Sequence, residues 1–165
     1  MQANIAPVEV ELESPVAEYG RWQNPETGEL AAEQKDHFIE RDGTQFAGTH
    51  LLLDLWGARH LDSIERIEQA MRDCVEACGA TLLHIHLHHF TPSGGVSGVA
   101  VLAESHISVH TWPERDYAAF DVFMCGDAEP WRAVDILKTA FGTNDVRVKE
   151  LLRGEGVVTE AGVAA

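Results

Sequence analysis

Positively charged residues are scarce in this chain of 165 residues, which has 12 lysines and arginines against 27 aspartates and glutamates, a formal net charge of −15. The imbalance argues against nucleic acid as a partner, because phosphate binding requires concentrated lysine and arginine. It equally disfavours binding to an anionic membrane surface. An acidic protein instead attracts cationic small molecules.

Long hydrophobic runs and a paired set of cysteines are also missing. No stretch reaches the roughly 18–20 uninterrupted apolar residues of a membrane helix, and Met1–Asn4 shows no basic start of a signal peptide. The three cysteines Cys74, Cys78 and Cys125 are an odd set, which predicts free thiols and not a disulfide framework. We therefore expect a soluble cytoplasmic protein.

The composition divides the chain into three parts. Residues 1–36 hold three prolines and eight acidic residues without sustained periodicity, which predicts a mostly irregular N-terminal extension. The alternative is that part of it, around Trp22, docks on the domain. Residues 37–153 carry the regular patterns of a folded domain, and residues 154–165 form a short tail.

The folded part predicts more strands than helices. Apolar patterns predict strands at 46–56, 81–90, 99–102, 107–111, 117–123 and 145–151, and helices at 63–78 and 130–141. Asp62 or Ser63 can cap the first helix. The expected fold is α+β, a two-layer α/β sandwich with a mainly antiparallel sheet and both helices on one face. The other face must be solvated, functional or paired with another subunit.

Residues able to do chemistry are concentrated between residues 94 and 126. Ser105 and His110 have opposite parity, so a flat strand would place them on different faces. If they cooperate, a bend must separate them, or Ser105 must lie at the start of the strand. Ser105 also lacks a Gly-x-Ser-x-Gly elbow. Spacing alone therefore gives candidates without a mechanism.

The segment Ala103–Glu114 reads Ala-Glu-Ser-His-Ile-Ser-Val-His-Thr-Trp-Pro-Glu. It resembles the processing-site signature of the small prokaryotic S-adenosylmethionine decarboxylases, and the likeness extends from Gly48 to Arg153. The resemblance implies a pyruvoyl-dependent proenzyme that makes the aminopropyl donor for spermidine biosynthesis from S-adenosylmethionine. It also implies a homodimer whose active sites draw on both subunits, and no metal.

The resemblance further implies the roles of the residues that process the chain. The Ser105 hydroxyl attacks the Glu104 carbonyl, the chain breaks between these two residues, and Ser105 becomes a pyruvoyl group that forms a Schiff base with the substrate. Ser97 matches the residue that stabilises the oxyoxazolidine intermediate. His110 matches the proton acceptor that removes the Cα proton during processing.

Three more positions match residues that act on the substrate. Cys125 matches the proton donor in catalysis. A thiol with a pKa of roughly 8.5 is mostly protonated at neutral pH and can therefore serve as an acid. The alternative is that Cys125 is a small core residue. Glu114 matches a residue that binds the ribose hydroxyls, and the alternative is a solvated turn residue. Phe90 is a candidate to stack on adenine. The loop from Thr91 to Ser97 is one residue longer than the commonest family spacing, and core packing is the alternative for Phe90.

A row of histidines, His84, His86 and His88, provides a competing signal for a zinc-binding module. Residues on one face of a strand lie about 7 Å apart, too far for three to reach one ion easily. A half-buried polar face at a subunit interface or beside the active site is the alternative. A second alternative function is that of a pyruvoyl-dependent arginine or ornithine decarboxylase. Glu114 disfavours it, because neither amino acid has a ribose.

Overall fold

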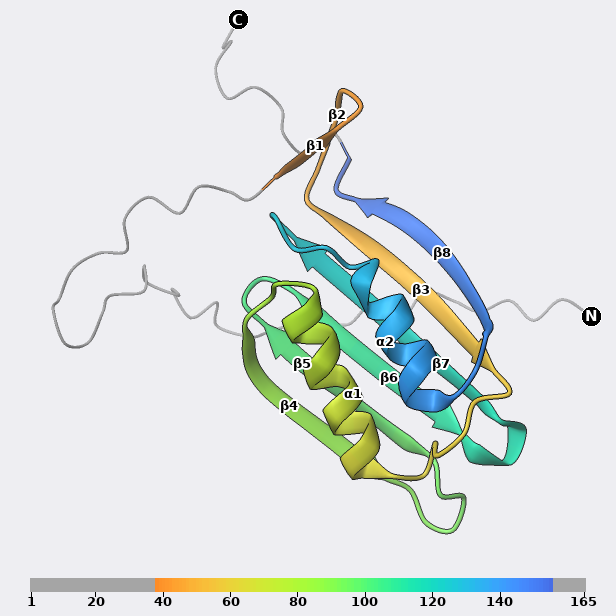
Figure 1. Cartoon of the computed structure of the whole chain (residues 1–165). Coiled ribbons are helices and arrows are strands. Elements are labelled where there is room, and N and C mark those ends of the chain that lie inside the picture. Colours follow the sequence, from red (N-terminus) through yellow and green to blue (C-terminus); the bar gives the residue numbers. More distant parts are fainter. Residues whose placement is uncertain (1–37, 156–165) are drawn as a thin grey trace, which may run out of the picture. The chain divides into compact units, whose positions relative to one another are not determined.

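The main body of the protein is a six-stranded antiparallel sheet with the strand order β4-β5-β6-β7-β3-β8 (Figure 1). It is seen in a computed structural model that describes residues 38–155. The strands are β3 (Gly48–Trp56), β4 (Leu82–His89), β5 (Val96–Leu102), β6 (His106–Trp112), β7 (Tyr117–Cys125) and β8 (Asp145–Arg153).

Both helices lie side by side on one face of this sheet (Figure 1). They are α1 (Ile64–Ala77) and α2 (Arg132–Phe141). Ser63 caps α1, because its side chain accepts a hydrogen bond from the backbone N–H of Arg66 at 3.3 Å. Gly142, in the left-handed conformation with a φ of 61°, ends α2. The predicted two-layer α+β sandwich is confirmed.

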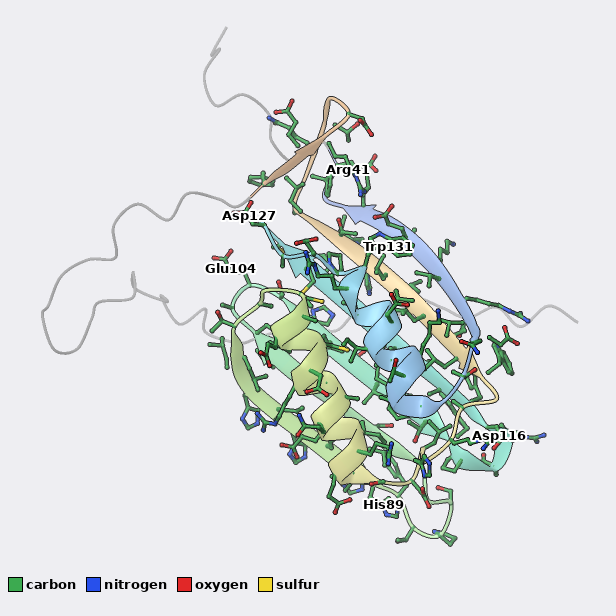
Figure 2. All side chains as sticks on the ribbon, in the orientation of Figure 1. Arg41, His89, Glu104, Asp116, Asp127 and Trp131 are labelled. Carbon is green, nitrogen blue, oxygen red and sulfur yellow. The ribbon has the colours of Figure 1, made fainter. Side chains whose placement is uncertain are left out.

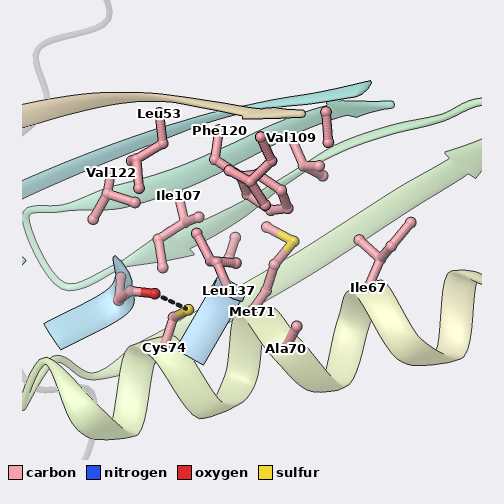
Figure 3. Close-up of a cluster of buried hydrophobic side chains, with 14 of the residues drawn as sticks. Leu53, Ile67, Ala70, Met71, Cys74, Ile107, Val109, Phe120, Val122 and Leu137 are labelled. Atoms are coloured by element: carbon pink, nitrogen blue, oxygen red, sulfur yellow. Dashed lines mark hydrogen bonds between the residues drawn. The ribbon is translucent and has the colours of Figure 1, made fainter. Parts of the chain in front are cut away.

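The core fills the space between the helices and the sheet. Figure 3 shows Met71 and Leu137 of the helices together with Ile107 and Phe120 of the sheet. Full burial of one such side chain contributes about 1.5–3 kcal/mol. The Cys74 thiol donates a weak hydrogen bond to a backbone oxygen of α2, and burial raises its pKa. All three cysteines are free thiols, as predicted.

The face of the sheet away from the helices is uncovered within residues 38–155, and we call it the open face. Along β7, Phe120 and Val122 are buried towards the helices, while Asp121 and Phe123 alternate with them and are partly exposed. Strand register extends the open face over all six strands. It includes His50, His84, His86, His88, Ser97, Val99, His106, Ser108, His110, Trp112, Tyr117 and Asp121.

A short hairpin precedes the sheet. It consists of β1 (Ile39–Arg41) and β2 (Thr44–Phe46), joined by Asp42 and Gly43, whose φ angles are 53° and 78°. Two positive φ angles are typical of a type I′ turn. The predicted strand at 46–56 was wrong at its start, because β2 and β3 are separate strands. Residues 1–37, including Trp22, and residues 156–165 lie outside the described part of the chain.

An ion pair links the hairpin to the main body, at a carboxylate that Trp131 of the main body also contacts. Arg41 forms an ion pair with Glu150 of β8 at 3.1 Å, and Trp131 donates a hydrogen bond to the same carboxylate oxygen at 3.1 Å. Between residues 38 and 155, neither helix has the length and apolar character needed to cross a membrane.

Candidate active site

Ser105 lies in the tight turn that joins β5 to β6. The backbone N–H of Leu102 donates to the Ser105 carbonyl at 2.9 Å and closes the turn. Glu104 has a φ of 59°, in the left-handed region that strains a residue with a side chain. Because β6 begins at His106, Ser105 lies at the start of the strand, which is one of the two arrangements that the parity argument allowed.

The Ser105 side chain is held in a defined position. Ser105 is only 8% exposed, and its Oγ accepts a hydrogen bond from the backbone N–H of Cys125 at 3.1 Å. Glu104, the residue before it, is exposed. The strained peptide bond and the hydroxyl group that could attack it therefore lie together at one end of the sheet.

A pocket of about 310 Å³ opens at this end, lined in part by Thr81, Glu104, Ser105, Cys125 and Asp127. Burial, and next the negative charge of Glu104, raise the pKa of the Cys125 thiol, while its contact with Ser105 lowers it. A raised pKa keeps this thiol protonated at neutral pH. Cys125 is therefore able to donate a proton beside Ser105.

Ser97 and His110 form a second group, on the open face. They are opposite partners in the register of β5 and β6, and Ser97 Oγ lies 2.8 Å from His110 Nδ1. A row of aromatic rings follows His110 along this surface, formed by Trp112, Tyr117 and Trp56. The Ser97–His110 pair can accept and pass on a proton, and the aromatic row provides a flat apolar surface beside it.

Phe90 and Glu114 share the end of the sheet that holds this second group. Phe90 directly follows β4, is 46% exposed, and has its ring centroid 4.6 Å from that of His88. This exposure argues against core packing. Glu114 is exposed in the short 3₁₀ helix η1 (Pro113–Arg115), which directly follows β6. β4 and β6 both run antiparallel to β5, so their C-terminal ends lie at the same end of the sheet.

The candidate residues thus form two half-sites at opposite ends of the sheet. The first half-site is Glu104, Ser105 and Cys125; the second is Phe90, Ser97, His110 and Glu114. Five residue steps along β6 separate Ser105 from His110, a distance of about 16 Å at roughly 3.3 Å per residue. In Figure 2, Glu104 and Asp127 are labelled at one end of the sheet, and His89 and Asp116 at the other. Neither the Ser105 nor the His110 side chain can span the distance between the two residues.

A polar network on the open face joins residues that the sequence pattern did not single out. Ser108 donates to Asp121 at 2.7 Å, and the other oxygen of this carboxylate lies 3.5 Å from His50 Nε2. Arg153 Nη1 lies 3.2 Å from His50 Nδ1, and burial lowers the pKa of His50. The four residues Ser108, Asp121, His50 and Arg153 come from β6, β7, β3 and β8. Alternation of polar residues in strands was the available signal, but the pairing of these strands was not visible in the sequence.

The histidine row does not form a metal site in one chain. His84, His86 and His88 share the open face of β4, as predicted. Among residues 38–155 of a single chain, no group of three or more histidine, cysteine, aspartate or glutamate side chains is arranged to hold a metal ion.

Fold and site together define a two-layer α/β sandwich with a strained serine turn between two strands of an antiparallel sheet. Comparison with known proteins narrows this class. Residues 49–154 match the family model described as S-adenosylmethionine decarboxylase. Because the match covers more than half of the chain, the protein belongs to the S-adenosylmethionine decarboxylase family.

Individual relatives agree with this assignment. The chain is 44% identical over 108 residues to an S-adenosylmethionine decarboxylase proenzyme of Thermomicrobium roseum, covering 65% of this chain and 93% of the relative. It is 46% identical over 110 residues to a proenzyme of the same name from Methanococcus maripaludis, covering 65% and 89%. The crystal structure of the adenosylmethionine decarboxylase from Aquifex aeolicus superposes with a TM-score of 0.61 at 32% identity, covering 73% of this chain and 98% of that one.

Proposed function

We propose that this chain is a proenzyme that cleaves itself between Glu104 and Ser105 and then decarboxylates S-adenosylmethionine. The observation that carries the proposal is the strained Glu104–Ser105 turn, with a buried hydroxyl held at its end and the Cys125 residue beside it. The names of the relatives, which are proenzymes of this decarboxylase, support the same reaction.

Cleavage begins at the strained turn. Ser105 Oγ forms a bond to the carbonyl carbon of Glu104, and the C–N bond breaks as the amide nitrogen takes up the hydroxyl proton, so that an ester replaces the peptide bond. His110 then removes the Cα proton of Ser105, and the Glu104 carboxylate leaves. Hydrolysis of the resulting dehydroalanine releases ammonia and leaves a pyruvoyl group at the new N-terminus.

The surroundings of Ser105 fit such a group. The pocket beside it gives a substrate access, and the backbone N–H of Cys125 is directed at Ser105 Oγ, the atom that departs with the Glu104 carboxylate. Such a group would supply, beside Cys125, an electron sink for the decarboxylation of a substrate that carries an amine. Cys125 supplies the proton that replaces the lost carboxylate, because its raised pKa keeps the thiol protonated.

A second copy of the chain completes the site. His110 and Ser97 lie about 16 Å from Ser105 in their own chain, by the strand rise of roughly 3.3 Å per residue. Packing two open faces against each other brings the His110 half-site of one chain to the Ser105 half-site of the other. The open face also presents Trp56 and Trp112, which are 39% and 40% exposed and would be covered in such a homodimer.

Substrate choice follows from the second half-site. The exposed Glu114 carboxylate can accept hydrogen bonds from two ribose hydroxyls, and the exposed Phe90 ring can stack on adenine. Arginine and ornithine have neither group, so we favour S-adenosylmethionine and a place in spermidine biosynthesis. Release of CO₂ from the three substrates tests this choice, and release from arginine or ornithine alone would contradict it.

Intact mass measured under denaturing conditions tests the cleavage. We expect two chains, residues 1–104 and residues 105–165, the second beginning with a pyruvoyl group that borohydride and substrate together label. Ser105→Ala provides the control and should remain one chain. A wild-type protein that decarboxylates the substrate while keeping an ordinary serine at position 105 would overturn the proposal. An uncleaved, inactive wild-type protein would favour the alternative of a non-enzymatic domain of the same fold.

A further inference from the structure

Three histidines of β4 have no part in the proposed reaction. His84, His86 and His88 project onto the open face, and all three are exposed. Neighbours in this row are about 7 Å apart, because they are two positions apart on one strand. One chain therefore cannot bring them to a single ion, but a second chain that faces the row changes this geometry.

The shared active site determines how the second chain must lie. His110 of one chain has to approach Ser105 of the other, and these residues lie at opposite ends of β6. A two-fold axis parallel to the strands would place the Ser105 end of one β6 opposite the Ser105 end of the other. The axis must therefore run across the strands, so that each strand faces its own copy in the opposite direction.

The same axis determines what β4 faces. It crosses β6 midway between Ser105 and His110, close to Ser108. In the sheet register Ser108 lies opposite Val99, and Val99 lies opposite His86. The axis therefore passes within about one residue of His86, by the two-fold relation and the strand rise. The two copies of His86 face each other across the gap between the sheets.

The remaining histidines follow from the reversed strand direction. His84 of each chain faces His88 of the other chain, on either side of the His86 pair. Packed sheets are about 10 Å apart, so side chains from both inner faces meet in the space between them. Imidazoles that are too far apart along one strand are thus close to imidazoles of the facing strand.

We infer that β4 of the two chains together forms a binding site for a divalent transition-metal ion on the two-fold axis, held by the two His86 imidazoles. This inference rests on the proposed function, because the two-chain arrangement is derived from it. Imidazole nitrogen suits Zn²⁺, Ni²⁺ and Cu²⁺ and binds zinc at about 2.0–2.1 Å. The excess of acidic residues favours the approach of a cation. The ion would link the two chains at the β4 edge, away from Ser105.

Metal titration of the untagged, full-length, EDTA-stripped protein tests the site. We expect saturable binding of Zn²⁺, and of Co²⁺ with visible d–d absorption, at one ion for every two chains. His86→Ala should weaken binding at least about tenfold, the loss expected when metal coordination is disturbed. His89→Ala is the matched control, because His89 has the opposite parity on β4 and should leave binding unchanged. Zinc should also slow dissociation of the wild-type dimer and not that of His86→Ala.

Two results would overturn the inference: no saturable uptake of either ion, or equal binding by the His86→Ala and His89→Ala proteins. Intact mass and sedimentation of the same samples separate this failure from that of the proposed function. A cleaved, active dimer without metal affinity would remove only the metal site. An uncleaved monomer would remove the shared active site, and the metal site with it.

Discussion

The two faces of the sheet are made from the same six strands, yet they differ in almost every respect. The face under the helices is apolar and closed, with Phe120 and Val122 at most 1% exposed. The open face carries the hydrogen-bonded pairs Ser97–His110 and Ser108–Asp121. One face therefore supplies the stability that holds the other in position for chemistry, and the period of two along each strand separates the tasks.

The largest expected effect comes from mixing two inactive variants. Ser105→Ala lacks the attacking hydroxyl and His110→Ala lacks the proton acceptor, so neither should yield pyruvoyl alone. In a mixed dimer, one site combines Ser105 of the His110→Ala chain with His110 of the Ser105→Ala chain. We expect pyruvoyl to form on the His110→Ala chain only in the mixture, as measured by intact mass. Formation in His110→Ala alone would show that His110 is dispensable.

The same substitution on two phenylalanines compares the closed core with an exposed site residue. Phe120→Ala should lower the free energy of unfolding by about 3–5 kcal/mol, because it leaves a cavity in the core. Phe90→Ala should change it by no more than about 0.5 kcal/mol, as is usual for exposed positions. It should instead raise the KM for S-adenosylmethionine. Urea unfolding and steady-state kinetics measure the two effects, and equal losses of stability would contradict the comparison.

Cys125 gives a smaller effect with a definite pH dependence. Cys125→Ala should lower kcat about a hundredfold, within the usual contribution of a general acid. Because the folded pKa is raised, the thiol is protonated at all pH values below that pKa and loses its proton only as the pH rises through it. The kcat of the wild type should therefore stay level from neutral pH past the ordinary thiol pKa of about 8.5 and fall above it. A fall near pH 7 would argue against Cys125 as the donor.

The contact of the N-terminal hairpin should have the smallest effect. Glu150→Gln removes the charge that pairs with Arg41, and both side chains are partly exposed, at 30% and 42%. Such pairs contribute about 0–1 kcal/mol. Urea unfolding should show that Glu150→Gln lowers the free energy of unfolding by an amount in that range. In 1 M salt the two proteins should be equally stable, because salt screens the ion pair of the wild type. A larger loss would mean that the hairpin is part of the cooperative core.

The sequence predicted the bounds of helices and strands well where apolar periodicity was strong. It predicted them less well where short turns or small polar residues set the ends of a strand. The helix at 63–78 and the strand at 81–90 were correct to within about two residues, because their apolar residues repeat regularly. β5 starts at Val96, whereas the apolar pattern predicted a start at residue 99. The prediction was late because Ser97 and Gly98 interrupt the apolar run. Gly98 is needed in the strand, because a Cβ there would lie 2.2 Å from the His86 carbonyl oxygen.

Other features were hidden for physical reasons. The Asp42–Gly43 dipeptide is a hairpin signal, but the hairpin that it forms was not predicted. The opposite parity of Ser105 and His110 was visible, but strand pairing decides that Ser97 lies beside His110 and Cys125 beside Ser105. The same holds for His50, which meets Asp121 only through the pairing of β3 with β7. Local patterns predict elements, and non-local pairing decides which side chains meet.

The strand order has a further consequence for the proposed cleavage. A break after Glu104 leaves β3, β4 and β5 on one fragment and β6, β7 and β8 on the other. The order β4-β5-β6-β7-β3-β8 interleaves them, so that β3 is enclosed between β7 and β8. The fragments share three hydrogen-bonded ladders, β5–β6, β7–β3 and β3–β8. The proposed cleavage would therefore nick the protein without releasing either fragment, because the two fragments would already be joined by these ladders.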